Sequence, residues 1–327
     1  MNKWLKRTAY TILVLFVLLN IMSAFQAYKL THFYAGIEKP KKPDEMNAAE
    51  KAGAVFFGVK YPKSKIVDSL LVPHETVWFK TEDSLKLEAW YLNSQFDDTI
   101  KPNIGTIIMF HGHAGSRSGV IKEAEAFYNI GYNVLMVDFR AHGSSDGTVC
   151  TIGFTEDRDV KAAYNYIKAN GEKNIILYGI SMGASTVMKA ISDYDLKPSK
   201  IILEMPFGSL LDATKGRLRM MHLPQQPLAS LLTFWGGAEQ GFWAFNFNPW
   251  DYATKINCPV LLQWGVNDPR VSEEETNHIF KNLSSHNKML VKYVNSGHES
   301  LCKKETAKWM RTVTDFLITR IPFNYTN

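Results

Sequence analysis

Short apolar runs alternate with amphipathic, helix-like segments across most of the chain. This alternation is typical of parallel strands that are joined by helices and covered by them on both faces. Strands are predicted at residues 105–110, 133–139, 174–178, 200–204, 259–264 and 289–294. Helices are predicted at residues 119–128, 156–169, 181–191, 273–283 and 305–318. The pattern therefore predicts one doubly wound, mostly parallel α/β domain.

Two weaker patterns precede this alternation. Residues 76–80 and 85–92 are rich in aromatic and β-branched side chains, and a polar tetrapeptide separates them. We expect them to form an antiparallel hairpin at the start of the domain. Residues 47–59 are predicted to form a short amphipathic helix. The α/β domain is placed at residues 74–327.

The alternation is interrupted once, between Glu204 and Pro259. This insertion carries more large apolar side chains than a surface connection needs. We expect a small cap at about residues 208–255 that forms one wall of an apolar pocket. The substrate-binding candidates within it are Phe234, Trp235 and Trp243. The alternative is that these aromatics pack only against the body of the domain.

Residues 8–28 are uncharged and mostly apolar. A helix that rises about 1.5 Å per residue over this length would cross a bilayer core of roughly 30 Å. We predict a single transmembrane helix within an anchor at residues 1–30, which acts as an uncleaved signal anchor and is followed by a linker at 31–73. The alternative is a cleaved signal peptide, although the apolar stretch is long for one.

The net charge of +5 comes from the amino-terminal region. Residues 1–43 hold seven Lys and Arg and one acidic residue, which leaves 30 basic and 31 acidic residues in the rest of the chain. A near-neutral body does not indicate nucleic-acid binding. The basic residues before the apolar stretch are the more tightly clustered, so the positive-inside rule favours an extracytoplasmic catalytic domain. The three cysteines read as isolated residues.

The most informative stretch is Gly179-Ile180-Ser181-Met182-Gly183, between a predicted strand and a predicted helix. A serine at such a turn takes a strained backbone conformation, and side chains two residues before and after it would collide with neighbouring backbone. Glycines at both positions remove the collisions. The turn lifts the hydroxyl above the sheet edge, beside the first N–H groups of the helix. Ser181 is therefore the candidate nucleophile.

A serine nucleophile needs a histidine base that is oriented by a carboxylate. Asp268 and His298 each follow a predicted strand near the carboxyl edge of the sheet, where catalytic groups gather in α/β proteins. Their chain order after Ser181 is the order of the Ser-Asp/Glu-His triad on this type of sheet. Glu204, at the end of the preceding strand, is the alternative acid. We expect His278 and His286 to be solvated.

Motifs in chain order extend this pattern: His111-Gly112, the run 138–145, Gly179 to Gly183, Gly265 to Asp268, and Gly297-His298. On these motifs the chain, over roughly residues 76–317, resembles the α/β-hydrolases, and within them the branch that includes serine aminopeptidases and monoacylglycerol lipases. The resemblance implies that the backbone N–H groups of His113 and Met182 form the oxyanion hole. One departure is Ala141, where the family usually has glycine. That position is expected to be structural, as are the side chains of Asp138, Asp146, His111, His113 and His142.

These features predict a serine hydrolase that cleaves carboxylic esters, including acyl lipids, through an acyl-enzyme. No cofactor is expected, and the His, Cys and acidic residues show no metal-ligand spacing. The same site could cut the amide bond of a short peptide, but an aminopeptidase would need a carboxylate to hold the substrate ammonium. Glu204 and Glu239 are the candidates for that role. A third possibility is a membrane-tethered binding protein on a non-catalytic hydrolase fold.

Overall fold

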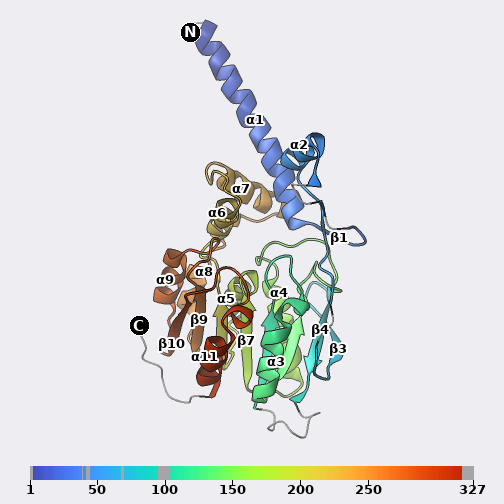
Figure 1. Cartoon of the computed structure of the whole chain (residues 1–327), viewed down its shortest axis with the longest axis vertical. Coiled ribbons are helices and arrows are strands. Elements are labelled where there is room, and N and C mark those ends of the chain that lie inside the picture. The colour runs from blue at the N-terminus through green and yellow to red at the C-terminus, as the bar shows by residue number, and fades with distance from the viewer. Residues whose placement is uncertain (1–2, 39, 42–44, 68–69, 95–103, 319–327) are drawn as a thin grey trace.

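The computed structural model describes residues 3–38, 40–41, 45–67, 70–94 and 104–318, and a twisted sheet forms its centre (Figure 1). Within these residues, eight strands form this sheet in the order β10-β9-β8-β7-β5-β6-β4-β3. The strands are β3 (Glu75–Lys80), β4 (Lys86–Leu92), β5 (Thr106–Phe110), β6 (Asn133–Val137), β7 (Ile175–Ile180), β8 (Lys200–Glu204), β9 (Val260–Gly265) and β10 (Lys288–Tyr293). Strand β4 runs antiparallel to both β3 and β6, whereas β5 to β10 are mutually parallel.

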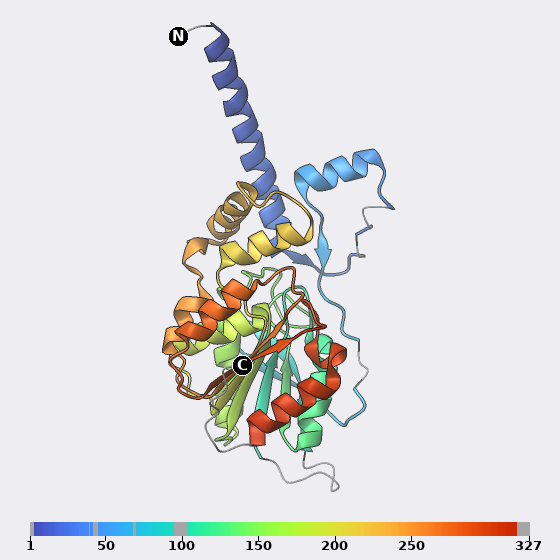
Figure 2. The ribbon, with the colours of Figure 1, turned by 60° about the vertical axis from the view of Figure 1, so that its left-hand side comes forward.

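Helices cover both faces of this sheet (Figure 2). The helices α3 (Ile121–Ile130) and α11 (Thr306–Ile318) lie on one face, and α4 (Asp157–Ala169), α5 (Met182–Tyr194) and α9 (Glu273–Asn282) lie on the other. The central strands β5, β6 and β9 are buried along their whole length, as parallel strands between two helix layers must be. The predicted α/β class, the strands and the hairpin are confirmed. Helix α5 runs one turn beyond the predicted end.

Helix α1 (Lys3–Thr31) projects from the end of the body at which the parallel strands finish (Figure 1). It is the one described helix that is long and apolar enough to cross a membrane. Its last turns are not free, because Ser23, Ala27 and Thr31 are buried. After it, β1 (Phe33–Tyr34) pairs in parallel with β2 (Tyr61–Pro62). The N–H of Phe33 also donates to the carbonyl of Thr148 at 2.8 Å, which anchors the start of the predicted linker to the body.

The predicted helix at 47–59 is present as α2 (Ala48–Phe57), which begins with a capping box between Asn47 and Glu50. None of its residues is buried. It lies beside α1 at the same end of the body (Figures 1 and 2). Residues 39, 42–44 and 68–69 of the predicted linker lie outside the described residues.

The insertion between β8 and β9 folds into α6 (Leu210–Met220), α7 (Leu228–Gln240), α8 (Pro249–Tyr252) and the 3-10 turns η4 (Ala244–Asn246) and η5 (Ala253–Lys255). Helices α6 and α7 lie between the body and α1, above the carboxyl edge of the sheet (Figure 1). Helix α7 packs against both α6 and α1. The insertion thus covers the end of the body at which catalytic loops were expected.

Candidate active site

Ser181 occupies a sharp turn between β7 and α5. Its φ of 53° and ψ of −115° lie in a region that side-chain-bearing residues rarely adopt. A Cβ atom on Gly183 would lie 2.3 Å from the carbonyl oxygen of Phe110, and one on Gly179 would lie 2.6 Å from the backbone nitrogen of Ala184. Both contacts are with backbone, which cannot give way cheaply. Only glycine at these two positions allows the turn to close.

Two loops bring the predicted partners to this hydroxyl. Asp268 follows β9 and His298 follows β10, and these strands are neighbours in the sheet. His298 Nε2 lies 2.9 Å from Ser181 Oγ, and His298 Nδ1 lies 2.7 Å from Asp268 Oδ2. The structure therefore brings the three predicted side chains into one chain of contacts. With Nδ1–H donating to the carboxylate, Nε2 is free to accept the serine proton.

The Asp268 carboxylate is held by backbone as well as by the imidazole. Its side chain is fully buried. Its second oxygen, Oδ1, accepts the N–H groups of Arg270 at 2.7 Å and Val271 at 2.9 Å. These bonds keep Oδ2 directed at His298. These hydrogen bonds satisfy the buried carboxylate oxygens and fix the orientation of the side chain.

The alternative acid, Glu204, lies elsewhere. Its carboxylate is fully buried, and Oε1 accepts the indole N–H of Trp309 at 2.6 Å and the amide of Gln263 at 3.2 Å. Burial raises the pKa of Glu204 to about 8. Glu204 contacts the turn only through its backbone: its carbonyl oxygen accepts the Ser181 N–H at 2.8 Å. Asp268, not Glu204, is therefore the carboxylate that contacts the histidine.

The two histidines expected to be solvated, His278 and His286, are exposed. His278 stacks on the ring of Trp250 with a centroid distance of 4.8 Å. Neither side chain belongs to the Ser181 cluster.

The two oxyanion-hole candidates flank Ser181. Met182 is the first residue of α5, so its N–H has no partner inside the helix. Across the turn, a Cβ on Gly112 would lie 3.6 Å from the Ser181 Cβ, which puts the loop after β5 in contact with the serine. Among the described residues, neither the His113 N–H nor the Met182 N–H donates a hydrogen bond to a protein acceptor. Both amides remain candidates to bind a substrate oxygen.

Two buried histidines hold the loops around this turn. His111 Nε2 accepts the N–H of Phe139, and His142 Nε2 accepts the N–H of Ala114. In each ring the other nitrogen contacts a backbone carbonyl at 2.8 Å. Burial lowers the pKa of His111 to about 4 and that of His142 to about 3, so both rings are neutral near pH 7. The prediction that these side chains shape the loops is confirmed.

The ring of His113 joins the loop to the amino-terminal helix. Its Nε2 lies 3.2 Å from the carbonyl oxygen of Leu30, near the end of α1. The buried ring of Phe33 contacts His113 and His142, with centroid distances of 5.4 and 4.8 Å. The sequence contains no local signal for this contact. The end of α1 is therefore part of the packing around the site and not only a connection to it.

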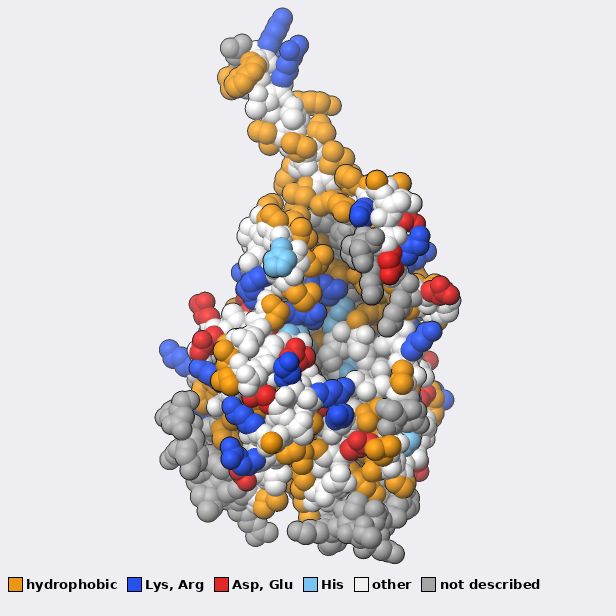
Figure 3. Space-filling view, viewed as in Figure 1, with side chains coloured by type: hydrophobic (Ala, Val, Ile, Leu, Met, Phe, Trp, Pro, Cys, Tyr) orange, Lys and Arg blue, Asp and Glu red, His pale blue; other side chains and the backbone are white. Residues whose placement is uncertain are grey.

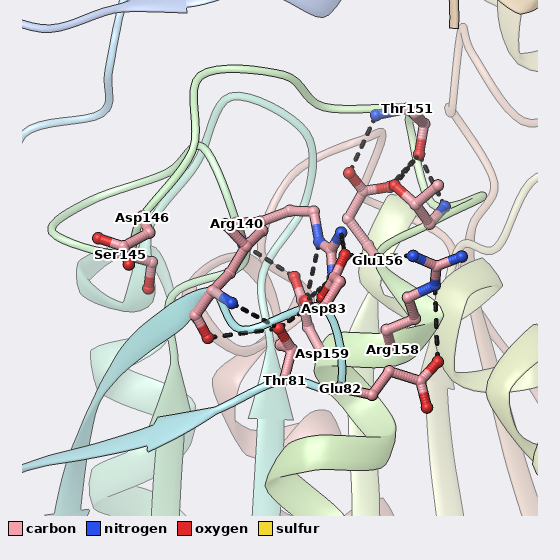
Figure 4. A network of polar contacts seen from close by, with 12 residues as sticks. Thr81, Glu82, Asp83, Arg140, Ser145, Asp146, Thr151, Glu156, Arg158 and Asp159 are labelled. Atoms are coloured by element: carbon pink, nitrogen blue, oxygen red, sulfur yellow. Dashed lines mark hydrogen bonds and ion pairs between the residues drawn. The ribbon is translucent and has the colours of Figure 1, made fainter. Parts of the chain in front are cut away.

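The loop after β6 is fastened by a buried ionic network (Figure 4). Arg140 pairs with Asp159 at 2.7 Å and with Asp83 at 2.8 Å. The next residue, Ala141, has a φ of 63°, in the left-handed region that favours glycine. Glycine would adopt this φ without strain, so alanine carries a local backbone cost here, and the ionic contacts of Arg140 hold the loop in place.

The two aspartates assigned to loop support have that role. Asp138 accepts the N–H of Arg117 at 2.7 Å, and Asp146 accepts the N–H of Lys86 at 2.8 Å. Both bonds join the loop after β6 to neighbouring segments.

The insertion aromatics face the amino-terminal helix as well as the body. Trp235 donates its indole N–H to Asn20 of α1 at 3.2 Å. It lies in a groove between α1 and α7 that Glu239 also lines, and burial raises the pKa of Glu239 to about 7. Phe234 and Trp243 contact each other edge to face and are 38% and 56% exposed. Their assignment to substrate binding stays a prediction.

No group of three or more His, Cys, Asp or Glu side chains in the described part of the chain is arranged to hold a metal ion. The three cysteines are free thiols.

A family model described as serine aminopeptidase, S33, matches residues 101–233. An esterase of Pyrococcus furiosus superposes with a TM-score of 0.64 at 25% identity, covering 78% of this chain and 96% of that protein. The chain belongs to the α/β-hydrolase superfamily.

Two relatives in this superfamily differ in how much they share with the chain. The mouse (Mus musculus) lysophosphatidylserine lipase ABHD12 is 26% identical over 208 residues, which are 60% of this chain and 48% of that protein. The uncharacterized protein YqkD of Bacillus subtilis is 27% identical over 252 residues, which are 73% of this chain and 82% of its own. The match thus spans about half the length of the ABHD12 lipase.

Proposed function

We propose that this α/β-hydrolase cleaves carboxylic esters of acyl lipids by a Ser-His-Asp mechanism. The observation that carries the proposal is the continuous contact from Ser181 Oγ through the His298 ring to Asp268. Esterase and lipase relatives support the reaction class. Residues 1–30 are proposed as the anchor, 31–73 as the linker and 74–327 as the hydrolase domain, with a cap at about 208–255.

The proposed reaction has two steps. Ser181 Oγ attacks the ester carbonyl while His298 Nε2 takes its proton, and the His113 and Met182 N–H groups bind the oxyanion. His298 then protonates the departing alcohol, which leaves an acyl-serine. Water, deprotonated by the same imidazole, attacks this ester, and the imidazolium returns that proton to the departing Ser181 Oγ as the carboxylic acid is released. Asp268 stabilises the imidazolium in both steps.

The positions of two carboxylates favour esters over aminoacyl amides. An aminopeptidase would hold its substrate ammonium with a carboxylate in the pocket. Glu204 is enclosed in the core and already bonded to Trp309. Glu239 lies in the groove against α1. Neither carboxylate contacts the side chains of Ser181, His298 or Asp268, which favours the ester proposal over the peptidase alternative.

The exposed apolar surface around α1 supports a membrane location. Leu13 and Phe16 of α1 are 57% and 56% exposed. Three consecutive side chains of α2, Val55, Phe56 and Phe57, are each more than half exposed at the base of this helix (Figures 1 and 2). Apolar side chains beside a spanning helix bury favourably at the bilayer surface. We propose a single-pass protein whose hydrolase domain sits against the extracytoplasmic face.

The test uses the full-length chain in detergent micelles. Wild type, Ser181→Ala and His298→Gln are compared for labelling by a fluorophosphonate and for hydrolysis of medium-chain nitrophenyl esters, monoacylglycerols and aminoacyl amides. Ser199→Ala, an exposed serine at the start of β8, is the matched control. We expect wild type and the control to label and to hydrolyse esters, and Ser181→Ala to do neither. Retained labelling in Ser181→Ala would refute the nucleophile, and cleavage of amides alone would refute the ester assignment.

A further inference from the structure

Helix α6 of the insertion is fastened to the loop that carries Asp268. A Cβ on Gly216 would lie 2.1 Å from the carbonyl oxygen of Arg270, so the helix and the loop touch backbone to backbone. Arg219 donates from Nε to the carbonyl of Pro269 at 2.9 Å and from Nη2 to the carbonyl of Arg270 at 2.8 Å. The position of α6 over the site is therefore fixed by direct contacts.

This contact brings two further arginines together. The backbone N–H of Arg270 bonds to Asp268, while its side chain extends to α6, where Nε lies 3.2 Å from Met220 Sδ. Arg217 is three residues before Met220 and so lies on the same face of the helix. Burial and the positive charge of Arg217 lower the pKa of the Arg270 guanidinium. Both charges also lower the pKa of His113, behind the larger effect of its burial. Because Arg270 lies two residues after Asp268 and its N–H bonds to that carboxylate, the pair adjoins the loop that carries the candidate acid.

The other enclosed arginines are each paired with carboxylates. Arg117 pairs with Glu88 and Asp138, and Arg140 pairs with Asp83 and Asp159. In the described part of the chain, neither Arg217 nor Arg270 forms an ion pair with a carboxylate. The nearby Asp268 is already engaged by His298. Two partly buried like charges without an acid are costly unless a ligand supplies the anion.

We propose that Arg217 and Arg270 bind the phosphate of a single-chain acyl-glycerol phosphate lipid whose ester lies at Ser181. Guanidinium groups match phosphate oxygens with paired hydrogen bonds. Figure 3 shows Lys or Arg side chains, with His beside them, along the hollow between the α6–α7 helices and the body. The same charges repel a substrate ammonium. This inference rests on the proposed esterase function and names the headgroup that the site selects.

The experiment compares two substrates that differ only in the phosphate, oleoyl-glycerol phosphate and monooleoylglycerol, in identical neutral micelles. The variants are Arg217→Gln, Arg270→Gln and the conservative Arg217→Lys. Within the described residues, the Arg217 side chain makes no hydrogen bond that the first variant would remove. Arg311→Gln on the exposed side of α11 is the matched loss of charge. A hydrogen bond to a charged group commonly changes binding roughly ten- to a hundredfold. We therefore expect kcat/KM for the phosphate lipid to fall about tenfold or more in Arg217→Gln.

Four further results are expected. Hydrolysis of monooleoylglycerol by Arg217→Gln stays within about twofold of wild type, Arg217→Lys recovers part of the loss, and Arg311→Gln matches wild type on both substrates. Glycerol phosphate, which has no acyl chain, competes with the phosphate lipid in wild type and competes less in Arg217→Gln. Fluorophosphonate labelling of each variant reports whether the site is intact.

Several outcomes would overturn the inference. Equal losses of kcat/KM on both substrates would show that Arg217 has a structural role. Unchanged kcat/KM on both substrates would show that Arg217 does not bind the phosphate. Stimulation of monooleoylglycerol hydrolysis by inorganic phosphate, without a preference for the phosphate lipid, would make the pair an effector site. Each of these leaves ester hydrolysis by Ser181 standing. Absence of ester hydrolysis in wild type would instead refute the proposed function itself.

Discussion

The strained backbone at Ser181 leads to a prediction about stability that is separate from activity. Its φ of 53° and ψ of −115° are unfavourable for any residue with a Cβ. Ser181→Ala keeps the Cβ and therefore the strain. Ser181→Gly removes the Cβ and, with it, the strain. Since neither variant has the hydroxyl, the difference between them isolates the backbone.

The expected difference follows from three contributions. Backbone strain of this kind costs about 1–3 kcal/mol, and glycine relieves it. Glycine also raises the entropy of the unfolded chain, which costs about 0.5–1 kcal/mol, and the lost Cβ of a half-buried residue costs about 0.4 kcal/mol. The balance is about 1 kcal/mol in favour of Ser181→Gly, equivalent to a rise in Tm of roughly 2–4 °C over Ser181→Ala.

The assay is thermal unfolding of both variants in the same detergent. Ala184→Gly in the Ser181→Ala background is the control, since Ala184 is buried in the first turn of α5. A helical backbone gains nothing from glycine, so this substitution should lower the free energy of unfolding by about 1 kcal/mol or more. The two glycine substitutions, three residues apart, should thus change the free energy of unfolding in opposite directions. A Ser181→Gly variant less stable than Ser181→Ala by 0.5 kcal/mol or more, roughly the ordinary cost of glycine, would show that the turn stores no strain.

Three more predictions follow from the site and its surroundings. Asp268→Asn should lower kcat for nitrophenyl esters by a factor on the order of a thousand or more, because an amide does not hold the imidazole in the required tautomer; a loss below about tenfold would contradict this. Burial raises the pKa of Glu204 from 4.5 to about 8. The protonated carboxyl therefore makes its full contribution to the free energy of unfolding below pH 4.5, and this contribution is lost as the pH rises through about 8. The Tm of Glu204→Gln should therefore fall less than that of wild type between pH 5 and pH 9, and parallel profiles would contradict the raised pKa. Deletion of residues 2–22 should release the protein from membranes and keep most ester hydrolysis, whereas deletion of 2–34 should also lower kcat, because it removes the packing on His113; equal kcat in the two deletions would show that this packing has no effect.

Much of the fold and the central part of the site could be predicted from the sequence because their signals are local. Buried parallel strands must be continuously apolar, so the strands from β5 to β10 are visible as short apolar runs. The glycine spacing around Ser181 marks the turn in the sequence, although only the clash at Gly179 is local, with the backbone of Ala184, and that at Gly183 is with Phe110 of β5. Loops that follow adjacent parallel strands open at the same edge of the sheet, which made Asp268 and His298 the expected partners.

The tertiary structure alone decided which of two carboxylates meets the histidine and which surfaces the insertion covers. Glu204 and Asp268 both end or follow a strand, and only three-dimensional packing encloses one against Trp309 and directs the other at His298. The contact of Trp235 with α1 joins residues 215 positions apart, and that of His113 with Leu30 joins residues 83 apart. A hydrophobic pattern tells which side of a segment is covered, but the covering partner depends on how distant segments pack. For the same reason, the sequence does not reveal that the Arg270 side chain reaches the face of α6 that carries Arg217.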